Sequence, residues 1–245
     1  MVKMEDGMKK KRPKKEYSQI RFYRKFFYFN YVLFKDLIHI LKYGREFNEY
    51  GLTMFCGRQG GGKTIAMVEY LERIRKKYPK CLIVTNFGYV YEDYPMNDWK
   101  DFYTIRNGTD GVIFAIDEIQ NEFSSTAWKT FPESLLSEIT QQRKQRVKIV
   151  ATSQVFTRVV KSLREQTYEV VECVTIGNRW TFTKAFDAAD YNSVVEDPDK
   201  KNKLRRLYRK NFVQDKKIRE LFDSYAKIEK MKKTDFIPRN ERVYE

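Results

Sequence analysis

A glycine-rich stretch, Gly57-Arg58-Gln59-Gly60-Gly61-Gly62-Lys63-Thr64, limits what this chain can fold into more than any other part of it. It satisfies the pattern G-x-x-x-x-G-K-[ST], follows an apolar run at 52–56 and precedes a helix-like segment at 65–77. A strand, a loop and a helix in this order distinguish a phosphate-binding loop from a chance match. The alternative is a glycine-rich turn before a surface helix, which the complete motif and its flanks disfavour.

The residue types in this stretch explain how it would bind phosphate. Backbone N–H groups from Gly60 to Thr64 can surround an anion only where no side chain blocks the approach, and the positive end of the next helix faces the same anion. Lys63 would contact the β- and γ-phosphates, and the Thr64 hydroxyl would bind Mg²⁺. Arg58 and Gln59 have no assigned contact. The residues predicted to bind the nucleotide are Gly57, Arg58, Gln59, Gly60, Gly61, Gly62, Lys63, Thr64 and Ile65.

A second motif is the apolar run 111–116, which ends in Asp117-Glu118. Asp117 would bind Mg²⁺ beside Thr64, directly or through water, and Glu118 would act as general base on the attacking water. Acidic residues often follow strands without such a role, but the position after a complete phosphate loop favours it. The paired carboxylates and the lack of an N-K-x-D sequence favour an ATP hydrolase over a GTP switch.

A third candidate, Gln154, ends the apolar run 147–153. If this strand lies between the phosphate-loop strand and the Asp117 strand, Gln154 can contact the γ-phosphate or the attacking water. The alternative is a polar strand end that faces solvent.

Apolar strands separated by helices predict an α/β fold of the P-loop NTPase class, with a predominantly parallel sheet covered on both faces. Two β-rich runs that flank Gly177-Asn178 predict a closing hairpin. Residues 87–105 read as irregular. The expected strands are 52–56, 80–86, 111–117, 147–153, 168–176 and 179–186, and the expected helices are 64–77 and 132–145.

The chain divides into four predicted segments. Residues 1–16 are expected to form a disordered basic arm. In 17–50, aromatic side chains recur at spacings of three and four among Lys and Arg, which predicts one or two amphipathic helices. This extension could pack on the core, contact another subunit or lie on a membrane, and its many aromatics favour the first two. Residues 51–196 form the P-loop ATPase core, and 197–245 a basic, partly helical extension with an apolar stripe.

The formal net charge of +15 resides on the two flanks. Residues 1–50 hold 13 Lys and Arg against 6 Asp and Glu, and residues 200–245 hold 16 against 7. Residues 51–199 hold 19 against 20. Such flanks attract DNA, RNA or an anionic membrane face, and DNA is the partner we predict; the alternative is solvated tails that aid solubility.

The three cysteines, Cys56, Cys81 and Cys173, lie in apolar runs without metal-ligand spacing, which indicates buried, reduced thiols and a cytosolic compartment. The N-terminus lacks a signal-peptide pattern, and no apolar stretch approaches the length of a membrane span. We therefore expect a cytoplasmic protein, with peripheral attachment to a membrane or a procapsid left open.

Together these motifs resemble the Zot-type ATPases, which comprise the zonular occludens toxin N-terminal domain and the filamentous-phage assembly proteins, within the FtsK/HerA group of DNA pumps. The resemblance spans roughly residues 52–172, including a helix that ends in Gln141-Gln142-Arg143-Lys144. It implies an additional-strand, RecA/FtsK-like fold with ATP and Mg²⁺ as cofactors. The residues at the group's motif positions are Lys63, Thr64, Asp117, Glu118 and Gln154.

The resemblance also implies a hexameric or pentameric ring in which an arginine finger reaches the neighbour's γ-phosphate. Arg143, Arg146 and Arg164 are candidates for that finger, and ordinary surface charge is the alternative for each. Zot-like proteins usually carry a transmembrane helix after the ATPase domain, whereas this chain has a basic tail there. That departure favours a soluble packaging or transfer motor.

The sequence thus predicts ATP-driven DNA translocation by a subunit ring, in viral genome packaging or DNA transfer. One alternative is an ATPase that powers phage or virion assembly and extrusion at a membrane. Another is a nucleotide-binding scaffold with little turnover. A portal, a capsid or a membrane-assembly protein is a candidate partner.

Overall fold

The computed structural model describes residues 22–98, 100–122, 142–194 and 197–222. The chain divides into two units, 1–45 and 46–245, which we describe separately. The predicted basic arm, most of the predicted helix 132–145 and the end of the C-terminal extension lie outside the described residues.

The described part of the first unit contains one helix, α1 (Phe22–Tyr43), where one or two were predicted. The helix ends because Gly44 adopts a φ of +85° and its N–H donates to the Ile40 carbonyl at 2.9 Å, a helix-end geometry that glycine allows. Its large apolar side chains are mostly exposed, among them Phe22 at 84% and Phe27 at 70%. Within the described parts of the chain, no helix combines the length and the apolar character needed to cross a membrane.

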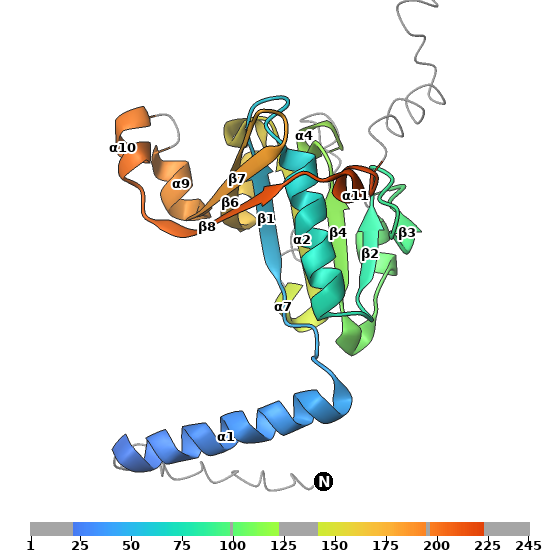
Figure 1. Ribbon diagram of the computed structural model, residues 1–245, viewed down its shortest axis with the longest axis vertical. Coiled ribbons are helices and arrows are strands. Elements are labelled where there is room, and N and C mark those ends of the chain that lie inside the picture. Colours follow the sequence, from blue (N-terminus) through green and yellow to red (C-terminus); the bar gives the residue numbers. More distant parts are fainter. Residues whose placement is uncertain (1–21, 99, 123–141, 195–196, 223–245) are drawn as a thin grey trace, which may run out of the picture. The chain divides into compact units, whose positions relative to one another are not determined.

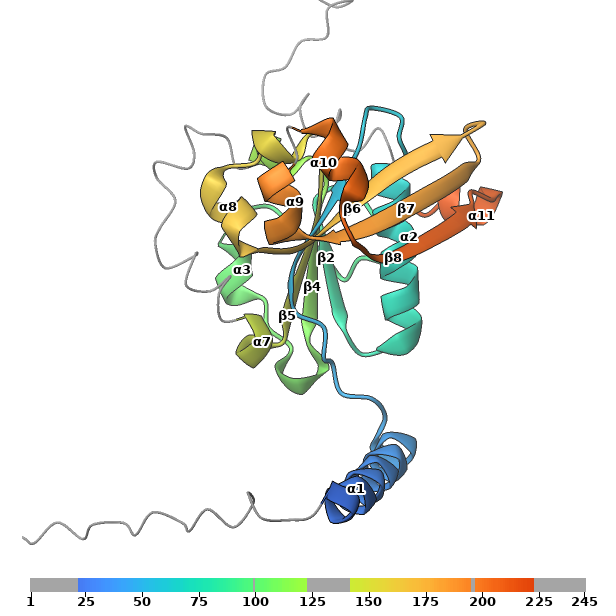
Figure 2. The ribbon, with the colours of Figure 1, turned by 90° about the vertical axis from the view of Figure 1, so that its left-hand side faces the viewer.

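The second unit is built on an eight-stranded sheet in the order β3-β2-β4-β5-β1-β6-β7-β8 (Figures 1 and 2). Neighbouring strands from β3 to β6 pair in parallel, whereas β7 pairs antiparallel with both β6 and β8. This arrangement confirms the predicted P-loop NTPase fold with a mostly parallel sheet. The strands are β1 (Gly51–Cys56), β2 (Leu82–Thr85), β3 (Tyr94–Pro95), β4 (Val112–Ile116), β5 (Val147–Ser153), β6 (Thr167–Ile176), β7 (Trp180–Asp187) and β8 (Arg206–Val213).

The register brings the carboxyl ends of three strands to one edge of the sheet. Ser153 at the end of β5 pairs with Cys56 at the end of β1, and Ala151 of β5 pairs with Ile116 at the end of β4. Because β5 lies between β1 and β4, the strand order assumed for Gln154 is confirmed.

Helices cover both faces of the sheet. Helix α2 lies on one face, where Met67 and Leu71 are fully buried. The opposite face carries a second apolar cluster, in which the Phe156 ring packs edge-on against Tyr191 at 5.6 Å. The helices of this unit are α2 (Lys63–Lys77), α3 (Asp101–Thr104), α4 (Ile119–Glu122), α7 (Gln142–Gln145), α8 (Lys161–Gln166), α9 (Ala188–Val194), α10 (Pro198–Lys203) and α11 (Lys216–Arg219).

The predicted hairpin forms between β6 and β7. Its turn residues Gly177 and Asn178 have φ values of 58° and 54°, so both occupy the left-handed region that such tight turns require.

The segment before β1 differs from its predicted assignment to the helical extension 17–50. Phe47 in this segment is 2% exposed, and its ring packs against Tyr78 with 5.1 Å between the ring centroids. Phe47 therefore belongs to the core unit and not to the helical extension that was drawn to residue 50.

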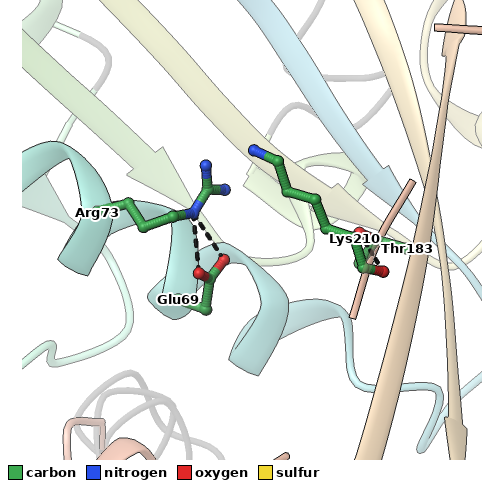
Figure 3. A network of polar contacts seen from close by, with 4 residues as sticks. All are labelled: Glu69, Arg73, Thr183 and Lys210. Carbon is green, nitrogen blue, oxygen red and sulfur yellow. Dashed lines mark hydrogen bonds and ion pairs between the residues drawn. The ribbon is translucent and has the colours of Figure 1, made fainter. Parts of the chain in front are cut away.

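The C-terminal extension, predicted to be partly helical, contains helices α10 and α11, and between them Arg206–Val213 forms strand β8, which was not predicted. The open edge of β7 supplies unpaired backbone groups, and β8 pairs with it along its length. Figure 3 shows the Thr183 hydroxyl of β7 donating to the Lys210 carbonyl of β8 at 3.3 Å, near the Glu69–Arg73 ion pair of α2. Burial, and then the positive charge of Arg73, lower the pKa of Lys210.

After β8 the chain crosses α2 near its N-terminal end (Figure 1). We call residues 214–222 the C-terminal strap. The Gln214 N–H donates to the Arg179 carbonyl at 2.6 Å beside the β6–β7 turn, and the Leu221 carbonyl accepts from the Val90 N–H at 2.8 Å beyond β2. The strap thus joins two sides of the sheet across the start of α2.

The α2 side of the sheet buries a charged residue that the sequence analysis had included in an apolar strand. Lys148 of β5 is 4% exposed, and its ammonium group donates to the Thr53 hydroxyl at 2.7 Å and to the Tyr50 carbonyl at 3.0 Å. Thr53 in turn donates to Glu169 at 3.0 Å. These partners keep a buried cation hydrogen-bonded, as the interior requires. The three cysteines are all buried and form no disulfide, as predicted, and burial raises the pKa of Cys81 and Cys173 to about 12.

Lys148 should make stability depend on pH. Burial lowers its pKa from 10.5 to about 8, so in this interval the unfolded chain holds a proton that the folded chain has released. The free energy of unfolding of the wild type should therefore rise through this interval. Relative to Lys148→Met, that gain should amount to roughly 3 kcal/mol between about pH 7 and pH 10.5, measured by urea unfolding. Other titrating groups cancel in the comparison, and a pH-independent difference would contradict the burial argument.

Candidate active site

The glycine-rich loop between β1 and α2 runs close to its neighbours. A Cβ atom on Gly57 would lie 2.6 Å from the Cys173 carbonyl oxygen of β6. Gly62, at a φ of +81°, ends the loop, and its Cβ would lie 2.3 Å from the Thr175 hydroxyl. These positions therefore require glycine, and the backbone N–H groups stay accessible to an anion.

Two side chains of the motif point toward the site. Lys63 is 8% exposed, and its ammonium group donates to the Arg58 carbonyl within the loop at 3.2 Å. The Thr64 hydroxyl donates to Oδ1 of Asp117 at 2.9 Å. The structure thus brings together the residues predicted from two motifs that are 53 positions apart. The Arg58 and Gln59 side chains are exposed, and the Ile65 side chain is buried, so Ile65 can offer an anion only its backbone N–H.

Asp117 is held from both neighbouring strands. Asn86, which follows β2, accepts from the Asp117 N–H at 2.7 Å and donates to the Asp117 carbonyl at 3.2 Å. The Thr152 hydroxyl of β5 donates to the Asp117 carboxylate at 2.7 Å. The carboxylate position is therefore fixed before any ligand binds.

Glu118 has a strained backbone with a φ of +52°, which is uncommon for a residue with a side chain. Its N–H donates to the Thr152 hydroxyl at 2.8 Å, which helps hold this conformation. Its carboxylate accepts from the Gln154 amide at 3.3 Å and from the Asn121 amide at 2.7 Å. Gln154 thus contacts the predicted base, whereas its contact with the γ-phosphate or the attacking water stays a prediction.

The donor set fits a Mg²⁺ ion. One carboxylate and one hydroxyl lie within hydrogen-bonding distance of each other, which suits an ion that usually takes few protein ligands and completes its shell with phosphate oxygens and water. In the described parts of the chain no group of three or more His, Cys, Asp or Glu could enclose a metal ion alone. Thr64 and Asp117 are the residues that would hold Mg²⁺.

Two clefts flank the loop. One, of about 540 Å³, reaches from the outer part of the loop to Gln154, Glu172 and Tyr191. The other, of about 580 Å³, lies between the inner part of the loop and the C-terminal strap. Both volumes are typical of small-molecule sites.

Two of the three candidate finger arginines make contacts within their own subunit. Arg146 is at the amino end of β5, where its guanidinium donates to the Phe47 and Thr109 carbonyls and pairs with Glu46 at 2.7 Å. These contacts give Arg146 a role in anchoring the linker before β1. Arg164 donates to Asn192 at 3.1 Å, between α8 and α9. Arg143 lies in α7, and its side chain is outside the described part.

Sequence reasoning missed the functional positions of Asn86, Asn121 and Thr152. A usable signal existed for two of them, because Asn86 and Thr152 end strands that neighbour β4 and so meet at the same edge of the sheet. Asn121 lies in α4, three residues after Glu118, and its amide donates to the Glu118 carboxylate. No sequence motif identifies this residue.

No family model and no curated protein matches this chain. The genome packaging NTPase B204 from Sulfolobus turreted icosahedral virus 2, in complex with ATP-gammaS, aligns with a TM-score of 0.44 at 12% identity over 58% of this chain and 93% of its own. The N-terminal domain of zonular occludens toxin from Neisseria meningitidis aligns with a TM-score of 0.51 at 16% identity, covering 71% of this chain and 99% of that domain. The chain therefore has the fold of the Zot N-terminal domain, as the resemblance implied.

Proposed function

We propose that this protein is an ATPase that uses Mg²⁺-ATP hydrolysis to translocate DNA. The observation that carries the ATPase part is the Thr64–Asp117 hydrogen bond, since it places a phosphate loop and a Mg²⁺-binding carboxylate at one point. Glu118 is adjacent and already oriented by Gln154 and Asn121.

In this mechanism the loop amides and Lys63 bind the triphosphate, and Lys63 exchanges its contact with the Arg58 carbonyl for phosphate oxygens. Thr64 and Asp117 would hold Mg²⁺, which would supply neutralisation of the phosphate charge. Glu118 accepts the proton of the attacking water, and Gln154 orients that water or the γ-phosphate. The neighbour's arginine finger stays a proposal without a fixed residue.

Thr152 is proposed to position both acidic residues. Its hydroxyl donates to the Asp117 carboxylate and accepts from the Glu118 N–H, so one side chain sets the metal ligand and the base relative to each other. It is fully buried, and water cannot replace it without a cavity.

The DNA part of the proposal is supported by charge. The basic flanks 1–50 and 200–245 carry the whole net positive charge, and polyphosphate backbones bind such segments by releasing counterions. In strand β8 the side chains of Arg206, Arg209 and Lys210 are exposed. Viral genome packaging or DNA transfer in the cytoplasm is the setting we propose, with a portal or capsid as candidate partner.

The hairpin supports a subunit ring. Ile176 pairs with Trp180 and Trp180 with Val213, so these three side chains share one face of β6–β7–β8, and each is about half exposed or more. Val174 on the same face also lines the cleft near Gln154. Exposed apolar patches of this kind mark protein interfaces. We propose that a second copy of this chain covers the patch and so contacts the nucleotide cleft, as in a hexameric or pentameric ring.

Hydrolysis should separate the roles of Lys63 and Glu118. Lys63→Ala should lose ATP binding and turnover, because the phosphate charge is left without its cation. Glu118→Gln should bind ATP normally but hydrolyse it at least roughly a hundredfold more slowly, since the general base is gone. Phosphate release and calorimetric binding check this, with circular dichroism as the control for folding. Wild-type turnover in either variant would remove that residue from the mechanism, and ATP binding without turnover in the wild type would favour a scaffold.

Thr152 offers a matched pair of variants. Thr152→Val keeps the shape but leaves the Glu118 N–H without its acceptor, which should cost about 1–3 kcal/mol of unfolding free energy and slow hydrolysis. Thr152→Ser keeps the hydroxyl and should stay close to wild type in both. Equal behaviour of the two variants in urea unfolding and turnover would refute the positioning role.

DNA should stimulate ATP turnover at low salt, and the stimulation should fade as salt rises, because the flanks bind phosphates electrostatically.

Trp180→Glu should lower both the oligomer mass measured by sedimentation and the DNA-stimulated ATP turnover, because it places a charge in the apolar patch. A monomeric wild type under all conditions would refute the ring.

An ATP turnover rate that DNA does not change at any salt concentration would favour the second candidate, ATP-driven phage or virion assembly at a membrane. The exposed aromatic side chains of α1 are the observation that supports that candidate.

A further inference from the structure

The cleft between the phosphate loop and the C-terminal strap shares Lys63 and Thr64 with the hydrolysis mechanism, but its strap wall has no part in that mechanism. The cleft has a volume of about 580 Å³, and the loop side of it includes Thr64 and Ile65. The opposite wall contains Gln214, Arg219 and Phe222 from the strap. A cleft of this size next to a phosphate site has room for more than phosphate.

The direction of the bound triphosphate follows from the sheet order. The γ-phosphate must lie toward Asp117, Glu118 and Gln154, which follow β4 and β5. Strand β1 lies between β5 and β6, so the cleft wall formed by Thr175 and Asn178 is on the other side of the loop. The Phe222 end of the cleft lies across the start of α2, where Phe222 bridges Tyr89. Ile65, whose N–H comes next after the Mg²⁺-binding Thr64, also lines that cleft. A nucleotide bound in this direction would have its α-phosphate end at the β6–β7 side of the cleft.

The strap wall is tied to the phosphate loop by a chain of hydrogen bonds. The Thr175 hydroxyl donates to the Gly61 carbonyl at 3.2 Å and lies 2.9 Å from the Thr181 hydroxyl. The Gln214 amide, which is 6% exposed, donates to Thr181 at 2.8 Å and accepts from the Arg219 guanidinium at 2.8 Å. The wall is thus a built surface that is continuous with the loop.

The chemistry of this wall suits a nucleoside. Arg219 presents a planar guanidinium that also donates to the Asn178 carbonyl, and Phe222 adds a half-buried aromatic ring. Flat cationic and aromatic groups stack on nucleobases, whereas ribose hydroxyls need polar partners such as the Asn178 side chain in the same cleft.

We propose that the C-terminal strap forms the nucleoside-binding half of the nucleotide site, with Arg219 and Phe222 holding the base and ribose. This inference rests on the proposed ATPase function. It makes residues after the last strand part of the ATP site.

Calorimetry with ADP and inorganic pyrophosphate tests this, because both ligands use the phosphate loop and only ADP has a nucleoside. The wild type should bind ADP at least about tenfold more tightly than pyrophosphate. Arg219→Ala and Phe222→Ala should each weaken ADP binding by about tenfold and leave pyrophosphate binding unchanged. Retained pyrophosphate binding shows that each variant is folded. Lys217→Ala removes the same charge from an exposed strap position outside the cleft and should change neither.

The outcomes separate the two proposals. Wild-type ADP affinity in both variants would overturn the nucleoside assignment alone. Equal weakening of ADP and pyrophosphate would also overturn it, because the strap would then act on the loop through Gln214 and Thr175. A wild-type chain that binds neither ligand would refute the proposed ATPase function, and with it this inference.

Discussion

The Asp117 carboxylate is the point on which the site depends. Its Oδ1 accepts hydrogen bonds from Thr64 at the start of α2 and from Thr152 of β5. The loop, the β4 strand end and the β5 strand end are therefore joined by one acidic group as well as by the backbone ladder. A carboxylate that already has two donors keeps its position without metal, so bound Mg²⁺ would exchange one contact and leave the scaffold in place.

Much of the fold could be predicted because its central strands are apolar on both faces. Val147–Ser153 was found with its bounds unchanged, and the Gly177-Asn178 turn located the hairpin. Strand β8 could not be found this way, since each of its faces mixes apolar with charged or polar side chains and it pairs with the open edge of β7. The buried charge of Lys148 likewise depends on acceptors distant in sequence.

The residues of the site likewise divide into those that a local motif identifies and those that only the sheet topology brings there. Lys63, Thr64, Asp117 and Glu118 belong to local motifs, and their spacing already implied their chemistry. Asn86 acts through its place in the sheet order and gave no motif of its own. Arg146 lies at the amino end of β5, at the other end of that strand from Gln154, so it has no contact with the site of its own subunit, and its role as a finger toward a neighbour stays a prediction. Residue type predicts chemistry here, and only topology decides which residues share a site.

In the proposed site, the two ends of ATP are held by different parts of the chain. The phosphate end is held by groups from β4 and β5, whereas the proposed nucleoside end is held by the strap, which leads from the basic strand β8. A strap that contacts nucleotide has a different free energy in the bound and unbound states. If the proposed DNA binding changes how the strap contacts nucleotide, DNA and nucleotide change each other's affinity by the same factor, because coupling is reciprocal. The covalent continuity of β8 and the strap thus gives the proposed DNA binding a physical route to the proposed nucleoside site without a separate domain.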